Sequence, residues 1–198
     1  MAFLIGSSDQ SNVYPVAAVR DGIVFPSTEN VLVFGRQKSI NAINEATKKG
    51  KKIVLVMQKN PSLDDPTKDQ IYHVGVLATI EKTVVGEKGE INALVKGKEK
   101  VKIVDFTKDN EYFEAKIQVI EEKFVNDEET QAMVRYISSQ VKKAINYGKT
   151  VDFVFLMNIL NVTSPQDFSN QIAIVLDLKS DERQELLEEN DLKTRLKK

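Results

Sequence analysis

The hydrophobic residues of this chain follow different periods in its two parts. Between residues 13 and 120 they form short runs rich in β-branched side chains, bounded by glycine, proline, asparagine or aspartate. Such runs predict strands joined by tight turns. The runs are GIVF, NVLVF, KIVLVM, HVGVLATI, EINALV, KVKIVDF and YFEAKIQVI. Many short strands favour a barrel or a sandwich over an open parallel sheet.

The connections between these runs predict further local structure. GIVFP and NVLVFG are interpreted as the first two strands, and TIEKTVVGEKGEINALVKG predicts a hairpin whose arms join across residues 86–89. In GRQKSINAINEATKKGKK, Ile40, Ile43 and Ala46 recur at helical spacing, and Gly50 is placed to end the helix. We expect this one helix to cover an end of the strand structure.

After residue 121 the period becomes that of helices. A stripe at spacings of three and four predicts a helix that Gly148 ends; its members are Met133, Val134, Ile137, Val141, Ala144 and Ile145. Residues 151–161 are nearly all apolar and predict a buried helix of a small bundle, although the period alone also fits a strand. Ser164 and Ser180 each predict a helix start, and a last helix begins near residues 190–191.

The change of period divides the chain into a β-rich part, residues 1–120, and a helical part, residues 121–198. The segment EEKFVND, residues 121–127, is the expected hinge between them, with a rigid connector as the alternative. The last predicted helix has no glycine, asparagine or proline to end it. We therefore expect the chain to continue into a larger protein, with a frayed terminal helix as the alternative.

Composition narrows the function. Charged residues make up 29% and hydrophobic residues 41% of the 198 residues, as in ordinary globular proteins. No apolar run approaches the ~20 residues that cross a bilayer, and MAFLIGSSDQSN lacks the basic region of a secretory signal, so no membrane association is predicted. The absence of cysteine suits a cytoplasmic location. A net charge of −1 makes nucleic-acid binding an unexpected main role.

Few residues suit catalysis or metal binding. His73 is the only histidine, so no multi-histidine metal site is predicted. Asp64 and Asp65 are adjacent, but their proline-bounded loop favours a turn, and Lys143 occupies the place where NYGKT would need a phosphate-loop glycine. A row of alternate lysines, residues 96–102, is interpreted as one face of a solvated edge strand. A binding surface is thus the main hypothesis, and a serine–lysine hydrolase a minor one.

Three stretches, in order, resemble the amino-terminal domain of the Lon family of ATP-dependent serine proteases. They are VYPVAAVRDGIVFPSTENVLVFGRQKSINAINEA, YHVGVLATI and IAIVLDLKSDERQELLEENDLKTRL, and the similarity spans residues 13–198. The matching motif residues include Pro15, Arg20, Asp21, Gly35, Arg36 and Gly75. The chain departs from the family pattern at AAVRD, at Ser27 and at Lys100, where the family has LPLRD, glycine and arginine.

The resemblance implies an α+β fold: an N-terminal PUA-like β-barrel with one covering helix, then a C-terminal helical bundle leading into a long helix. It implies a noncatalytic domain that binds unfolded or damaged polypeptides and delivers them to ATPase and protease parts. ATP, Mg²⁺ and the Ser–Lys protease segment are expected only downstream, so no cofactor, metal or catalytic residue is assigned here. A hexamer is expected for the full-length protein.

The substrate-binding residues are predicted from apolar positions expected to be exposed. They are Val24, Phe25, Pro26, Val33, Phe34 and Met57. The motif residues are interpreted as structural, with Arg20 and Asp21 forming a turn held by a local ion pair. The alternative function is a free-standing binding module of the same fold, for a small ligand or a folded partner.

Overall fold

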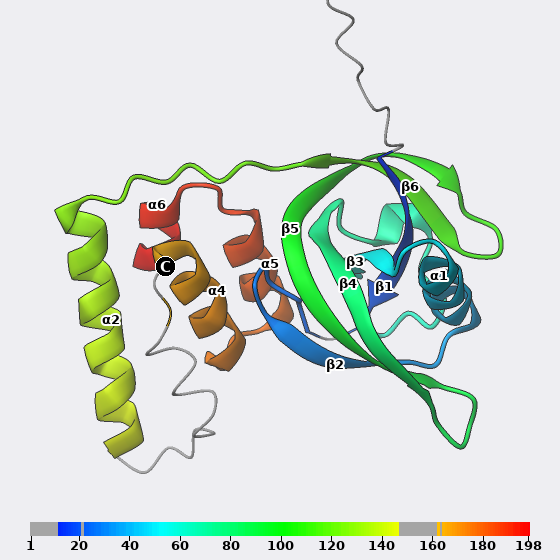
Figure 1. Ribbon diagram of the computed structural model, residues 1–198, viewed down its shortest axis with the longest axis horizontal. Coiled ribbons are helices and arrows are strands. Elements are labelled where there is room, and N and C mark those ends of the chain that lie inside the picture. Colours follow the sequence, from blue (N-terminus) through cyan, green and yellow to red (C-terminus); the bar gives the residue numbers. More distant parts are fainter. Residues whose placement is uncertain (1–11, 21, 147–161, 163) are drawn as a thin grey trace, which may run out of the picture.

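The computed structural model describes residues 12–20, 22–146, 162 and 164–198. Strands dominate the first part and helices the second (Figure 1). The strands are β1 (Val13–Val19), β2 (Glu29–Phe34), β3 (Lys52–Met57), β4 (Val74–Val85), β5 (Ile91–Lys108) and β6 (Phe113–Val119). The helices are α1 (Gln37–Lys48), the short 3₁₀ helix η1 (Lys68–Gln70), α2 (Glu128–Asn146), α4 (Pro165–Val175), α5 (Ser180–Glu188) and α6 (Leu192–Lys197).

The strands form one mixed sheet in the order β2-β5-β4-β3-β1-β6. β1 and β3 are parallel, and the other pairs are antiparallel. The long strand β5 also pairs with β6, so the pairings of β5, β4, β3, β1 and β6 close a circuit around the curled sheet (Figure 1). The α+β class is therefore confirmed.

The central strands are apolar on both faces because both faces are buried. Ala17 and Leu55 belong to one core cluster, whereas their neighbours Val16 and Val54 belong to a second cluster on the opposite face. Strand β1 was not among the predicted runs. Its Pro15, which lacks a backbone donor, pairs only with β6, outside the register that β1 shares with β3.

Two local predictions are confirmed. The hairpin joins β4 and β5 across residues 86–89, with the Gly86 amide donating to the Glu90 carbonyl. Helix α1 buries Ile43 and Ala46 and is followed by Gly50 at a φ of +87°, a left-handed conformation that suits glycine.

The prediction that GIVF forms a strand is wrong. Residues 22–25 have no regular structure and lead into a turn at residues 26–27. Both the amide and the hydroxyl of Thr28 donate to the carbonyl of Phe25, at 3.3 and 2.7 Å. The backbone is thus satisfied within the turn, while the side chain of Phe25 is buried in the core.

The lysine row is also corrected. Lys100 is buried, whereas Lys98 and Lys102 are exposed, so these residues do not share one solvated face. The pairing of β4 with β5 shifts register beside Lys98. Such an irregularity changes the face on which the following side chains lie.

The helices of the second part begin as the pattern predicts, with one shift. The Ser164 hydroxyl accepts from the Asp167 amide and caps α4, and Asp191 caps α6. Helix α5 begins at Ser180, so its cap position is Lys179 and not Ser180. The predicted helix at 151–161, the Gly148 helix end and the side chains of Ala144 and Ile145 lie outside the described residues.

The two parts share one hydrophobic core and a buried ionic network. Three buried residues from the helices after residue 121 belong to the strand cluster: Ala173, Leu186 and Leu187. Lys100 of β5 donates to the Leu187 and Glu189 carbonyls at 2.9 and 3.0 Å and lies 3.1 Å from the Glu122 carboxylate. Both terminal nitrogens of Arg195 of α6 donate hydrogen bonds to the same carboxylate. Glu122 therefore forms ion pairs with both strand β5 and helix α6.

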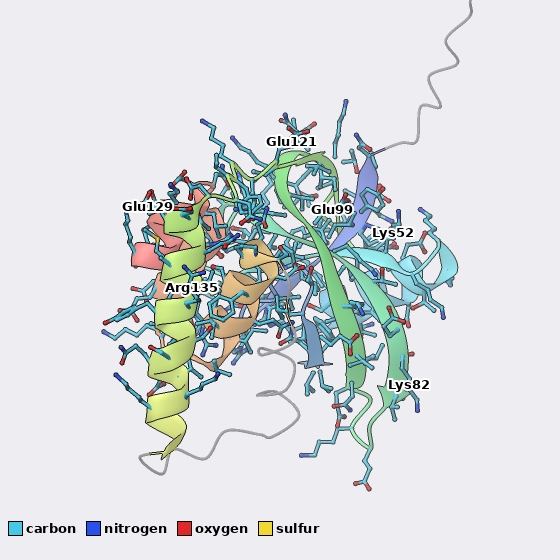
Figure 2. The ribbon with its side chains drawn as sticks, turned by 60° about the vertical axis from the view of Figure 1, so that its left-hand side comes forward. Lys52, Lys82, Glu99, Glu121, Glu129 and Arg135 are labelled. Atoms are coloured by element: carbon cyan, nitrogen blue, oxygen red, sulfur yellow. The ribbon has the colours of Figure 1, made fainter. Side chains whose placement is uncertain are left out.

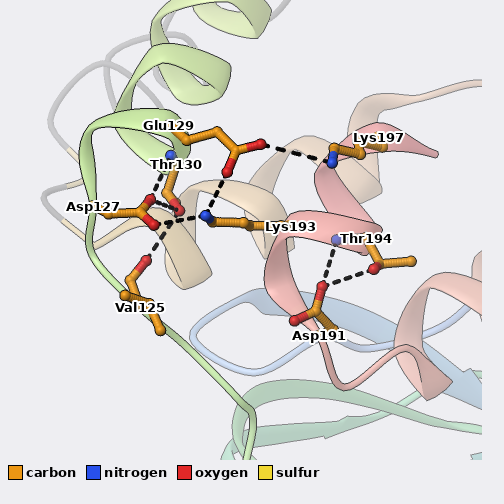
Figure 3. A network of polar contacts seen from close by, with 8 residues as sticks. All are labelled: Val125, Asp127, Glu129, Thr130, Asp191, Lys193, Thr194 and Lys197. Carbon is orange, nitrogen blue, oxygen red and sulfur yellow. Dashed lines mark hydrogen bonds and ion pairs between the residues drawn. The ribbon is translucent and has the colours of Figure 1, made fainter.

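The predicted hinge forms hydrogen bonds and ion pairs with residues at the start of α6 and just before it. The Lys123 amide donates to the Asn190 carbonyl at 2.9 Å, and the Lys123 carbonyl accepts from Leu192 at 3.3 Å. Further along, Lys193 lies 2.6 Å from both Asp127 and Glu129 (Figure 3). These contacts join the segment to α6 and to Asn190 before it, and its role as a hinge stays a prediction.

Candidate binding surface

Strand β2 is an edge strand. In the described part of the chain it pairs only with β5. The Gly97 amide donates to the Thr28 carbonyl, and every second residue after Thr28 therefore makes the ladder bonds to β5. By this alternation, the backbone amides and carbonyls of Val31 and Val33 point away from β5.

The side chains of β2 alternate as well. Leu32 and Phe34 face the core, whereas Val31 and Val33 are 69% and 65% exposed. Residues directly opposite in a ladder share a face of the sheet. Val33 is opposite Asn92 of β5, which is opposite Val84 of β4, and Val84 is also exposed. Val31 and Val33 thus form an apolar strip on the outer face of β2, and the polar residue Asn92 separates this strip from Val84.

A groove of about 560 Å³ runs beside β2. One side is formed by the end of β1 and the residue after it, and the other by β2 and the start of α1. Its lining residues are Ala18, Val19, Arg20, Val31, Leu32, Val33, Phe34, Gly35, Arg36 and Ser39. The groove is therefore apolar along the strand and cationic at the end where β2 meets α1.

The cations at this end differ in their partners. Arg20 lies 2.8 Å from Asp64, and Lys38 lies 3.3 Å from Asp65. Arg36 instead donates to the side-chain carbonyl of buried Gln58. Among the described residues, the other terminal nitrogen of Arg36, Nη1, has no hydrogen-bond partner. Burial, with the nearby charge of Arg20, lowers the pKa of Arg36.

Gln58 holds Arg36 in place. Its amide nitrogen donates to the carbonyls of Asn60 and Leu63, at 2.6 and 3.1 Å, so its oxygen is fixed toward the guanidinium. The loop that carries Asp64 and Asp65 thereby braces the cationic end of the groove. These two carboxylates serve as ion-pair partners, in agreement with a structural loop.

The exposure assumed for the six predicted binding residues is wrong for four of them. Val24, Phe25, Phe34 and Met57 are buried, and the first three belong to the strand core. Strong apolar character made them candidates, but it is also what the core selects. Val33 is exposed on β2, and Pro26 is half-buried beside the gap between strands and helices. Their role in binding remains a prediction.

The motif residues are dispersed. Arg20, Gly35 and Arg36 line the groove, whereas Pro15 is buried in β1. Gly75 of β4 faces the carbonyl oxygen of Leu55, which an added Cβ would approach to 2.3 Å, so close strand packing requires glycine there. Asp21 lies outside the described residues, and the ion pair that the structure describes for Arg20 is with Asp64.

Sequence reasoning missed Val31 and Val84. The signal for Val31 was available, because ENVLVF alternates and places Val31 and Val33 on one face. Only the sheet order shows that this face is open to solvent. Val84 needed the register between β4 and β5 as well; Lys82, two residues before it, marks this arm of the hairpin in Figure 2.

The gap between strands and helices offers a different surface. It encloses about 320 Å³ and is bordered mainly by polar and charged residues, including Lys98, Glu99 and Asp167. Apolar capture is thus better supported at β2 than at this gap. In the described ranges, no set of three or more His, Cys, Asp or Glu side chains is placed to hold a metal ion, and no helix is long and apolar enough to span a bilayer.

Together, the mixed sheet and the helices that follow it define an α+β domain with an open groove beside β2. The chain belongs to the family described as the ATP-dependent protease La (LON) substrate-binding domain, whose model matches residues 13–198. The resemblance seen in the sequence is thereby confirmed.

The curated relatives are much longer proteins. The chain is 34% identical over 189 residues to a Lon protease of Aquifex aeolicus, covering 93% of this chain and 24% of the relative. It is 35% identical over 176 residues to a Lon protease of Azospirillum brasilense, covering 89% and 22%. The chain thus spans about a quarter of the length of these relatives.

Two solved structures share the fold. The N-terminal domain of a Mycobacterium avium complex Lon protease superimposes with a TM-score of 0.74 at 17% identity, covering 93% of this chain and 94% of that one. A Lon N-terminal domain protein from Xanthomonas campestris gives 0.63 at 16% identity, covering 93% and 95%. At such identities the likeness concerns the fold alone.

Proposed function

We propose that this domain recognises unfolded or damaged polypeptides and delivers them to the ATPase and protease parts of a Lon-type protease. The observation that carries the proposal is the exposed apolar strip on an edge strand, with Val31 and Val33 beside an open groove. Exposed apolar patches of this kind mark interaction sites. Unfolded chains expose apolar side chains without a fixed order, and a shallow apolar strip suits such partners.

The rest of the proposal follows from the family. The closed circuit of strands corresponds to a PUA-like barrel, and the helices after it to a helical bundle. ATP, Mg²⁺ and the serine protease chemistry belong to other parts of the full-length protein, which works in the cytoplasm as a hexamer. Weak single contacts then add up, because several copies of the domain present the same strip around one ring.

The test compares an unfolded protein with its folded form. Reduced, carboxymethylated lactalbumin stays unfolded, and native lactalbumin provides the folded partner. We expect amide chemical-shift changes at β2 with the unfolded form only. The absence of chemical-shift changes with either form, or equal binding of both forms, contradicts the proposal.

A pair of double variants locates the site. Val31→Ser with Val33→Ser should weaken binding of the unfolded protein about tenfold, since each variant removes apolar contact worth roughly 0.8 kcal/mol per CH₂ group. The matched control is Val104→Ser with Val125→Ser, which removes similarly exposed valines outside the groove. An equal loss in both pairs would point to nonspecific contact.

A further inference from the structure

The open edge of β2 provides more than apolar side chains. The backbone groups of Val31 and Val33 point away from β5, so donors and acceptors of an extended strand line the groove. An unpaired edge of this kind is a template for another strand. Natural proteins commonly protect such edges with charge, but the two outward side chains at the middle of β2 are valines.

The two ends of β2 differ in charge. At the start, Glu29 is already paired with Lys96 across the ladder at 2.8 Å. At the other end, Arg20 and Lys38 are paired with Asp64 and Asp65. Arg36 makes no ion pair among the described residues, although the charges of Asp64 and Asp65 act on it, and its Nη1 is buried without a hydrogen-bond partner. The end beyond Phe34 is thus the place where an acidic group of a partner gains most.

We infer that the domain binds its partner by strand addition: an extended polypeptide segment with alternating apolar residues pairs with the free edge of β2 and places an acidic side chain against Arg36. This inference rests on the proposed function and names the conformation and chemistry of the recognised segment. Main-chain hydrogen bonds give the affinity and tolerate many sequences, whereas Val31, Val33 and Arg36 give the selectivity.

The geometry makes the inference specific. A strand beside β2 turns every second amide toward it, and its side chains alternate between the face of Val31 and Val33 and the opposite face. The apolar side chains of the partner must lie on the valine face. For either direction of the added strand, their position therefore fixes one alternate set of amides that bonds to β2 and another that points to solvent.

The first experiment uses two isomeric peptides on the full chain. Both are capped, alternate valine with threonine and carry one glutamate near an end; one is N-methylated at the valines and the other at the threonines. Methylation blocks an amide donor, so the isomer that loses the amides facing β2 should bind at least about tenfold more weakly. Amide chemical shifts are followed up to a peptide concentration of about 1 mM. At that concentration a binding free energy of only about 4 kcal/mol can still be detected.

The outcomes separate the two proposals. Unequal isomers support strand addition, and equal isomers, or no binding of the unmethylated peptide, overturn it. If unfolded lactalbumin still binds in a manner that depends on Val31 and Val33, the proposed function stands without strand addition. If unfolded lactalbumin does not bind either, both fail.

The second experiment tests the acidic contact by a double-mutant cycle. The unmethylated peptide is compared with one carrying glutamine in place of glutamate, on the native chain and on Arg36→Gln. We expect the native chain to prefer glutamate about fivefold to tenfold and Arg36→Gln to lose that preference. Arg36→Lys keeps the charge and should retain part of it.

Arg20→Gln is the matched control, because Arg20 lines the same groove but already holds Asp64. It should leave most of the glutamate preference intact. The amide spectrum of each variant shows whether the fold is kept. A preference that survives in Arg36→Gln, or that is lost equally in Arg20→Gln, overturns the role of Arg36.

Discussion

The strand part and the helical part of this domain are stabilised in different ways. The strands bury both faces of β1, β3 and β4 and share two extensive apolar clusters. The described helices have a small cluster of their own, centred on Phe168 and Ile172, and depend on the strand core and on the ions around Glu122. The comparison teaches that the described helices are joined to the strands both by shared apolar contacts and by a buried ionic network.

The ionic network carries its own cost. Burial lowers the pKa of Lys100, although the nearby Glu122 carboxylate opposes that shift. Burial alone would raise the pKa of Glu122, but the hydrogen bonds and charges of Arg195 and Lys100 lower it. Each ion is thus tolerable only while the others are present. The helical part should therefore be sensitive to a single polar change, and the strand part to a change in volume.

The largest effect is expected in the strand core. Phe25→Ala removes a fully buried ring and should lower the free energy of unfolding by about 3–5 kcal/mol. Urea denaturation measures the change as a shift of the midpoint. Val33→Ala, on the exposed face, should change stability by less than about 0.5 kcal/mol. A small effect of Phe25→Ala would mean that this residue is not in the core.

Glu122→Gln tests the helical side of the comparison. It leaves buried Lys100 and Arg195 without their shared carboxylate and should cost about 3 kcal/mol. Urea denaturation, monitored both by tryptic cleavage and by circular dichroism, measures the loss of unfolding free energy. The control is the exposed neighbour Glu121, marked in Figure 2, whose change to glutamine should be nearly neutral. Equal stability of the two variants would contradict the dependence on the network.

Gly97→Ala tests how closely the irregular segment 22–25 packs on β5. An added Cβ would lie 2.1 Å from the carbonyl oxygen of Phe25, so the backbone must move, at a cost of about 1–3 kcal/mol. Thermal unfolding measures this loss. Gly35→Ala is the control, since its added Cβ meets nothing within 4 Å. If both variants unfold at the same temperature, the close contact is not rigid.

Lys193→Met removes a cation that lies between Asp127 and Glu129 (Figure 3). These groups are near the surface, and exposed ion pairs contribute little. We expect a small loss of thermal stability, clearly below that of Gly97→Ala, together with faster amide exchange at the start of α2. Lys142→Met, an exposed change on α2 itself, should leave that exchange rate unaltered.

Acid should release the same contact gradually. The hydrogen bond from Lys193, followed by those from the amide and hydroxyl of Thr130, holds the pKa of Asp127 at about 2. Because the folded pKa lies below the ordinary value, the stabilisation is present above about pH 4 and decreases as the pH falls toward 2. The stability difference between the native chain and Asp127→Asn should shrink over that range, as thermal unfolding at several pH values will show.

Much of the fold could be predicted from local patterns. The β4–β5 hairpin, helix α1 with Gly50, and the caps of α4 and α6 depend on a few neighbouring residues, and each appears where its pattern places it. The binding residues were harder. Phe25 and Val33 are both apolar residues near turns in the sequence, yet one fills the core and the other is exposed.

The sequence by itself determined the α+β class, the change from strands to helices near residue 121 and most helix starts, because these follow from spacing and from backbone preferences within a few residues. Only the tertiary structure decided that β2 is an edge, that Arg36 rests on Gln58 and that Lys100 is buried against Glu122. Exposure and ion pairing depend on residues far apart in the chain, and no local pattern specifies which of them meet.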